Sequence, residues 1–508
     1  MKKHHIFCMC ILLTMAVMPL YAATMSGKVR SINKEISEKV FVQPEEYLPS
    51  VVQALTSGLS GTAERVKVLH DWICDNIAYD TDVFKKNNNI KKQDYITVLK
   101  KKKAVCAGYT NLMNEMCHLA GIESIGISGY SKGFGYRGSI KKGQKPDHAW
   151  NAVKIGNRWQ QIDVTWDAGF CDWEHFVKHY STDWLYLTPE QFIFSHLPED
   201  EQYQYLKEPI SVKEFVEQPY VTGKFFVQGL AFSKDMPCYN NEIEECVSWD
   251  FLVKDSNILV DADLTTSAGN FITNSCWTDR ISGKVTASFD VPDSSEYKAR
   301  LLSRRKGEIV NPLFIPIGEW ESAILPNAMG LVQEKKITQN EYDLLEASYE
   351  KVQKNGRYYI QEDLFDSQRN NAVAKILKLL NKNTANLEEV FSINIKTSKS
   401  YKGYAKEKEY KAGRFPLKYI SQTECLNTKL VEPRSGSVEK GTKVLFSIQS
   451  KDYSGFAFVI NDEWNLFNYN TSTGCYELEL EVPDVDSLTL MGTKNKRQYD
   501  GILTYTVR

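Results

Sequence analysis

The stretch DHAWNAVKIGNRWQQIDVTW, residues 147–166, shows most directly how the first part of the chain folds. Its two apolar runs are separated by Gly156-Asn157, a pair that favours a two-residue hairpin turn. The pattern therefore predicts two antiparallel strands, His148 to Ile155 and Arg158 to Trp166.

The hairpin brings a histidine and an aspartate together on one face of the predicted sheet. A two-residue turn makes Trp150 face Asp163 and leaves His148 diagonal to Asp163, roughly 7–8 Å apart at the backbone. An aspartate inside an apolar strand is costly to bury unless a protonated group meets it. His148 is the partner that this register offers, and a slip of one residue would separate the two side chains.

A cysteine stands at the start of a predicted helix upstream of the hairpin. Apolar residues at helical spacing predict a helix from Cys106 to Ala120, and Gly121 stops it. The first turn of a helix favours an anion, and the run Lys100 to Lys103 acts in the same direction, so the position favours a reactive thiolate. Taken alone, this position favours a buried structural cysteine over a nucleophile.

The neighbouring segments predict the fold class. A second helix begins near Thr62, and a short strand is expected at Ser124 to Ser128 before the hairpin. Helices followed by antiparallel strands are typical of an α+β fold.

These residues resemble a known family. The likeness is specific over about residues 60–208 and is weak afterwards. The segments Val105–Tyr109, Asp147–Asn151 and Trp159–Trp166 look like the three motif blocks of the transglutaminase-like (papain-related) cysteine-peptidase core, and the helix around Trp72 also matches. The tail Leu187–Asp200 resembles the kyphoscoliosis-peptidase branch, in which such a core precedes β modules.

The resemblance implies a catalytic triad and an activity. Cys106 would be the nucleophile, His148 the general base and then acid, and Asp163 the group that orients the imidazole. The reaction would be acyl transfer through a thioester on a protein or peptide substrate, with no cofactor and no metal. Water as acceptor gives a peptidase or amidase, whereas a lysine amine gives a crosslinking transglutaminase. Lys103-Ala104 stands where a glycine often precedes the motif, which affects the expected pocket rim.

Three other motifs fit their surroundings less well. Gly129–Gly133 has the spacing of a serine-hydrolase elbow, and Gly133–Gly138 that of a dinucleotide fingerprint, but no helix is predicted after either. We interpret 126–143 as a glycine-rich loop. Cys171, His175 and His179 recur every four residues and would line one face of a helix, although the aromatic residues among them favour packing over metal binding.

Composition excludes several classes of protein. The chain has 508 residues and a formal net charge of −2, so no overall positive field favours nucleic acid. Glycine, proline and aromatic contents are those of globular proteins. A length of 508 residues suggests about three domains.

The N-terminus predicts export. Residues 1–23 combine two lysines, an apolar run and the pair Ala22-Ala23, which is typical of a secretory signal peptide, with a retained signal anchor as the alternative. We expect no integral membrane span after its removal. The mature protein would be secreted or periplasmic, and partners in the cell envelope would bind its β modules.

The predicted organisation has six parts and leaves one rival function open. The parts are a signal peptide (1–23), an N-terminal segment (24–60), the transglutaminase-like core (61–208), a β-sandwich, Ig-like module (209–320), a helical segment (321–390) and a second such module (391–508). The rival function is a non-catalytic adhesion or scaffold protein that uses the core as a binding module.

Overall fold

The computed structural model divides the chain into two compact units, which are described separately. One holds residues 11–216 and 307–386, and the other holds 1–10, 217–306 and 387–508. The residues described are 25–32, 34–84, 92–133, 135–171, 176–233, 236–244, 246–267, 272, 275–305, 320–354, 372–373, 375–376, 379–380, 388–397, 415–418 and 427–508. The predicted signal peptide, 1–23, lies outside them.

Helices lead the first unit. They are α1 (Gly27–Ser31), α2 (Lys34–Lys39), α3 (Pro44–Thr56), α4 (Thr62–Asn76), α5 (Tyr95–Lys101) and α6 (Cys106–Leu119), with a 3₁₀ turn at Thr81–Phe84. A short parallel pair, β1 (Ala78–Tyr79) and β2 (Lys103–Ala104), leads into α6. Helix α6 ends as the sequence predicts, because Gly121 adopts a left-handed φ of 66°.

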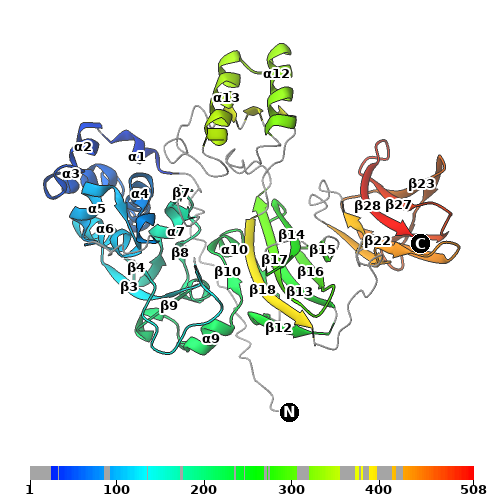
Figure 1. Ribbon diagram of the computed structural model, residues 1–508, viewed down its shortest axis with the longest axis horizontal. Helices are drawn as coiled ribbons and strands as arrows, with labels where there is room; N and C mark the ends of the chain where they lie inside the picture. Colours follow the sequence, from blue (N-terminus) through cyan, green and yellow to red (C-terminus); the bar gives the residue numbers. More distant parts are fainter. Residues whose placement is uncertain are drawn as a thin grey trace. The chain divides into compact units, whose positions relative to one another are not determined.

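A five-stranded antiparallel sheet follows these helices. Its order is β8 (Leu185–Leu187), β5 (Arg158–Ile162), β4 (His148–Ile155), β3 (Ser124–Ser131) and β9 (His196–Pro198). Helix α6 packs on β3 and β4, and α4 packs on α6 (Figure 1). The apolar core lies between these layers and includes Trp72, Tyr109 and Met113. The α+β class expected from the sequence is confirmed.

The predicted hairpin register is confirmed, but the predicted length of its second strand is wrong. Ala152 pairs with Gln161 and Ile155 with Arg158, as a two-residue turn requires. Strand β5 ends at Ile162, and the following residues form α7 (Val164–Ala168). The reason is local, since the Asp163 side chain accepts hydrogen bonds from two backbone N–H groups of α7 and so starts a helix.

Two further expectations are corrected. Strand β3 continues to Ser131, so the first part of the predicted 126–143 loop is strand. Cys171 and His179 do not share a helix, because β6 (Gly169–Cys171) and β7 (Phe176–Lys178) pair as antiparallel strands. His175 lies outside the described residues, and the helical face that a metal would need is absent from the described part of this segment.

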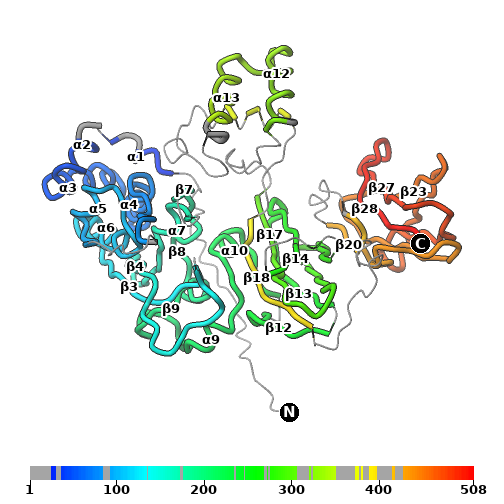
Figure 2. The backbone as a smooth tube through the Cα atoms, viewed as in Figure 1, coloured from blue at the N-terminus to red at the C-terminus, as the bar shows by residue number. Residues whose placement is uncertain are grey.

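The rest of this unit completes the core and adds a helical part. The core ends with α8 (Pro189–Phe192), a 3₁₀ turn (Glu201–Gln204) and α9 (Val212–Glu217). The helical part contains a π turn (Trp320–Ile324), α12 (Leu325–Gln333) and α13 (Gln339–Lys354), and the two helices lie side by side (Figure 2). A capping box begins α13, with Thr338 and Glu341 each accepting from the other's backbone N–H.

The second unit contains two β modules, each built of two sheets. The first module has one sheet of β10 (Tyr220–Val221), β18 (Glu388–Thr397), β17 (Glu296–Arg305) and β14 (Ile258–Thr266), with β12 (Asn240–Ile243) paired to β18. Its other sheet holds β11 (Leu230–Phe232), β13 (Cys246–Val253), β16 (Lys284–Asp290) and β15 (Cys276–Ile281), and α10 (Gly223–Val227) precedes it. The boundary expected at 390/391 falls inside β18, whose pairing with β17 places it in the first module.

The second module repeats this arrangement. The strand order of one sheet is β19 (Leu417–Lys418), β28 (Asp500–Val507), β27 (Ser487–Thr493), β23 (Gly455–Ile460) and β24 (Glu463–Leu466), with β21 (Ser437–Val438) paired to β28. The strand order of the other is β20 (Thr428–Glu432), β22 (Lys443–Ser450), β26 (Cys475–Glu481) and β25 (Asn468–Asn470). Strands β16 and β26, each followed by Val-Pro-Asp, both stand third in a four-stranded sheet.

Gly129 gives a test of how tightly the core sheet is packed. A Cβ at this position would lie 2.2 Å from the Leu197 carbonyl oxygen and 2.6 Å from the Trp150 ring. We expect Gly129→Ala to destabilise the first unit, which contains residues 11–216, by roughly 1–3 kcal/mol. The reason is that backbone atoms cannot move aside as a flexible side chain can. Calorimetric unfolding measures this loss. Gly27→Ala, which meets nothing within 4 Å, is the control and leaves the transition unchanged; equal transitions for the two variants would contradict the packing described.

Candidate active site

The predicted partners His148 and Asp163 are joined by a short hydrogen bond. His148 begins β4, and Asp163 follows β5 at the N-cap of α7. The hairpin register brings their side chains together, and His148 Nε2 lies 2.6 Å from Asp163 Oδ2. Asp163 is fully buried and His148 is 8% exposed, so water competes little for this bond.

The Asp163 carboxylate is held by four donors. Its Oδ1 accepts from the backbone N–H groups of Thr165 and Trp166, at 2.8 and 3.1 Å. Its Oδ2 accepts from His148 and from His196, whose Nε2 lies at 3.1 Å. A carboxylate with donors on both oxygens is fixed in orientation and strongly favoured in its charged form.

Burial and charge have opposite effects on the His148–Asp163 pair. Burial disfavours both charged forms, but the attraction and hydrogen bond between the two side chains outweigh it. The pKa of His148 is raised to about 10, and the pKa of Asp163 is lowered below its ordinary range. The pair is therefore an imidazolium next to a carboxylate at neutral pH.

Cys106 contacts the same imidazole. It is the first residue of α6, is half-buried, and carries a free thiol. A side-chain hydrogen bond joins it to His148 and contributes to the raised pKa of that histidine. Because Nε2 of His148 faces Asp163, Nδ1 is the ring nitrogen available to the sulfur. The structure thus brings all three predicted residues together.

His196 is a fourth member of this cluster that the sequence analysis did not select. Its Nε2 faces Asp163, and its Nδ1 lies 2.7 Å from Ser195 Oγ. Burial lowers the pKa of His196 to about 4, so the ring is neutral at pH 7. A neutral ring that donates from Nε2 must accept at Nδ1, which the Ser195 hydroxyl satisfies. The sequence feature that could have identified His196 is the presence of a histidine within the apolar stretch 192–197.

Aromatic side chains enclose the two histidines. The ring centroid of Trp166 lies 5.4 Å from that of His148 and 4.4 Å from that of His196. Phe192 stacks on His196 at 4.2 Å, and Trp150 contacts both histidines. This apolar wall excludes water, and therefore strengthens the ion pair and restricts rotation of the imidazoles.

His148, Asp163 and His196 are residue types that could bind a metal ion, but their ligand atoms already form hydrogen bonds with one another. One ligand atom from each of His148, Asp163 and His196 lies within 4.8 Å of the others. These atoms are bonded to one another, and the imidazolium form of His148 has no lone pair to offer a cation. The donor set therefore fits a hydrogen-bonded relay better than a metal centre.

None of the described cysteines forms a disulfide bond. They are Cys74, Cys106, Cys117, Cys171, Cys238, Cys246, Cys276 and Cys475, and Cys425 lies outside the described residues. Burial raises the pKa of Cys74, and raises that of Cys117 to about 12, which keeps both protonated. Cys106 differs from these two in its helix N-terminus and its imidazolium partner.

Comparison with known proteins identifies a matching superfamily and two similar peptidases. Residues 49–164 match the Transglutaminase-like superfamily. The kyphoscoliosis peptidase of Mus musculus is 33% identical over 187 residues, and that of Homo sapiens is 34% identical over 187 residues. Both alignments cover 36% of this chain and only 28% of the relative.

A solved structure described as a TGase is 19% identical over 27% of this chain and 34% of its own, with a TM-score of 0.19. The match to the superfamily covers Cys106, His148 and Asp163 and ends before His196. Residues 49–164 thus match the transglutaminase-like domain, and part of the chain is similar to the kyphoscoliosis peptidases.

Proposed function

We propose that the protein is a thiol-dependent acyl transferase that hydrolyses peptide or amide bonds through Cys106, His148 and Asp163. One observation supports the proposal, namely that Cys106 and Asp163 both contact the same imidazole. The likeness to two kyphoscoliosis peptidases supports a peptidase rather than a binding module.

In the first step, the Cys106 sulfur attacks the substrate carbonyl carbon. Its position at the start of α6 places the growing negative charge on the substrate oxygen near unpaired N–H groups of the first helical turn. His148 then delivers its Nδ1 proton to the leaving nitrogen. The carbon–nitrogen bond breaks, leaving an amine and a Cys106 thioester.

In the second step, the acyl group passes to an acceptor. Neutral His148 now takes a proton from water as the water oxygen attacks the thioester carbon. The carbon–sulfur bond breaks, the carboxylic acid leaves, and the sulfur departs as a thiolate beside the newly protonated His148. Asp163 stays ionised throughout, because four donors hold its carboxylate, and it acts by orienting and stabilising the imidazolium.

We also propose that the protein is exported. The sequence 1–23 supports this, and the mature protein would then act on proteins or peptides outside the cytoplasm. Within the described part of the chain, no helix is both long and apolar enough to cross a membrane. Partners for the β modules in the cell envelope form part of the same proposal.

The reactivity of Cys106 tests the proposed nucleophile. At neutral pH we expect iodoacetamide to label Cys106 faster than the half-buried Cys171 of the same protein. His148→Ala should slow labelling of Cys106 roughly 100-fold, because the imidazole that is hydrogen-bonded to the attacking sulfur is gone, and should leave Cys171 unaffected. Mass spectrometry of the digested protein measures both sites. Equal Cys106 rates with and without His148 would exclude the proposed pair.

Product analysis separates the candidate activities. Full-length wild type and Cys106→Ala are incubated with extracellular or envelope proteins, and the mixtures are examined by mass spectrometry. We expect new cleavages that depend on Cys106. New Gln–Lys links would show crosslinking in place of hydrolysis, and neither product would favour a scaffold.

The two histidines predict opposite trends of stability with pH. The folded-state pKa of His148 is raised from 6.5 to about 10, so its stabilising effect is complete below pH 6.5 and is lost as the pH rises toward 10. The folded-state pKa of His196 is lowered to about 4, so stability falls as the pH drops from 6.5 toward 4.

Urea unfolding of the full-length protein at about pH 5, 7 and 9, followed for the unit that contains residues 11–216, measures both effects. Relative to wild type, His148→Gln should flatten the loss of stability on the alkaline side. His196→Gln should flatten the loss on the acid side. Parallel pH curves for all three proteins would contradict these charge states.

A further inference from the structure

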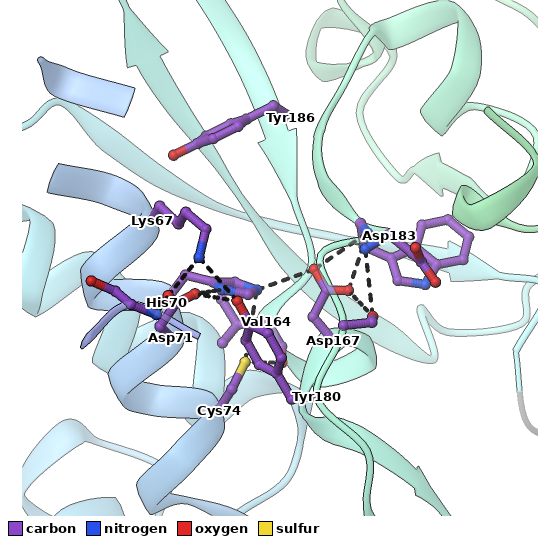
Figure 3. A network of polar contacts seen from close by, with 12 residues as sticks. Lys67, His70, Asp71, Cys74, Val164, Asp167, Tyr180, Asp183 and Tyr186 are labelled. Atoms are coloured by element: carbon purple, nitrogen blue, oxygen red, sulfur yellow. Dashed lines mark hydrogen bonds and ion pairs between the residues drawn. The ribbon is translucent and has the colours of Figure 1, made fainter. Parts of the chain in front are cut away.

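A second group of buried charges connects α4 with α7. Lys67, His70 and Asp71 lie on α4, and Asp167 lies on α7; these four residues are called the α4–α7 charge network below (Figure 3). His70, Asp71 and Asp167 are fully buried, and Lys67 is 7% exposed. The chemistry proposed above does not use any of them.

His70 bridges the two carboxylates of the network. Its Nδ1 lies 3.1 Å from Asp71 Oδ1, and its Nε2 lies 3.1 Å from Asp167 Oδ2. A ring that faces an acceptor at both nitrogens must carry both protons. Burial opposes this charge, but the hydrogen bonds to the two carboxylates favour it, and the pKa of His70 is raised well above its ordinary value. Burial keeps the Cys74 thiol neutral, so the carboxylates are the groups that hold the proton.

The network is balanced in charge. Lys67 Nζ lies 2.6 Å from Asp71 Oδ2, and the Tyr180 hydroxyl donates to Asp71 Oδ1 at 2.7 Å. Two cations, Lys67 and His70, therefore match two carboxylates inside the protein. Removing one member leaves a buried charge uncompensated, which costs far more than losing an exposed ion pair.

Asp167 fixes α7 through this network. The Ser181 hydroxyl and the Trp184 backbone N–H also donate to its carboxylate. Cys74 on α4 donates to the Val164 carbonyl oxygen at 3.7 Å. Since α7 has only five residues, it is too short to be stable alone, and its place depends on such contacts.

Helix α7 in turn supplies groups of the candidate active site. Its Thr165 and Trp166 N–H groups orient the Asp163 carboxylate, and the Trp166 ring packs against His148. The backbone N–H of Asp167 also bonds to the Asp163 carbonyl, 3.2 Å away. Any displacement of α7 would therefore alter the pair that sets the charge of His148.

We propose that His70 and Asp167 are positioning residues, whose buried ion pair holds α7 so that Asp163 orients His148 for the reaction at Cys106. The inference rests on the proposed function, and it adds residues that never touch the substrate.

The first test replaces the central cation. His70→Gln keeps a side-chain donor and removes the positive charge. We expect labelling of Cys106 by iodoacetamide to slow roughly 10-fold at neutral pH. The midpoint of the plot of labelling rate against pH should move up by about one pH unit. Val51→Ala in the buried face of α3, chosen to lower the melting temperature by a similar amount, is the control and leaves the profile in place.

The second test uses the charge balance. Asp167→Asn and His70→Gln each leave one buried charge unmatched, whereas the double variant is balanced again. We expect the double variant to label Cys106 faster than either single variant. Additive slowing in the double-mutant cycle would show that the two residues are not coupled and would overturn the proposal.

A milder variant keeps the proposal testable if His70→Gln does not fold. Ser181→Ala removes one donor from Asp167 and leaves every charge in place. We expect a smaller slowing in the same direction, and an unchanged profile would overturn the proposal. Wild type and His148→Ala are measured alongside. If Cys106 labelling does not depend on His148, the proposed function fails; if it depends on His148 but not on His70, Asp167 or Ser181, only this inference fails.

Discussion

The Asp163 carboxylate is the group on which the candidate site depends. Four donors converge on it, two from the backbone of α7 and two from imidazoles. Because the carboxylate is buried and remains charged, it keeps His148 protonated despite burial of the ring. The proposed nucleophile therefore faces a cation whose position is fixed before any substrate binds, which is what electrostatic preorganisation requires.

The buried polar side chains near this carboxylate form two groups, an inner layer that contacts the carboxylate itself and an outer layer that contacts α7. The inner layer contains His148 and the neutral His196, whose low pKa prevents a second positive charge beside the first. The outer layer is the α4–α7 charge network, which acts on the other end of a five-residue helix. Apolar rings of Trp150, Trp166 and Phe192 enclose the inner layer. Buried charge of this kind contributes orientation more than stability.

Much of the core could be predicted from the sequence, because local rules decide it. The Gly156-Asn157 turn sets the register, and α6 begins at Cys106 and is followed by Gly121 as expected. The end of β5 could not be predicted from alternation, since the Asp163 cap turns the chain into α7. His196 and His70 were not selected because the carboxylates that give them their roles, Asp163 and Asp167, lie 33 and 97 residues away in the sequence, and no local pattern joins them.

The most direct measurement is the titration of the His148 imidazole by NMR in the full-length protein with labelled histidine, in wild type and in Asp163→Asn. The account predicts an imidazolium that persists above neutral pH in wild type, with a pKa near 10. Without the carboxylate, burial dominates, and the pKa should fall below the ordinary value of 6.5. A wild-type His148 that is neutral at pH 7, or one that titrates alike in both proteins, would contradict the account.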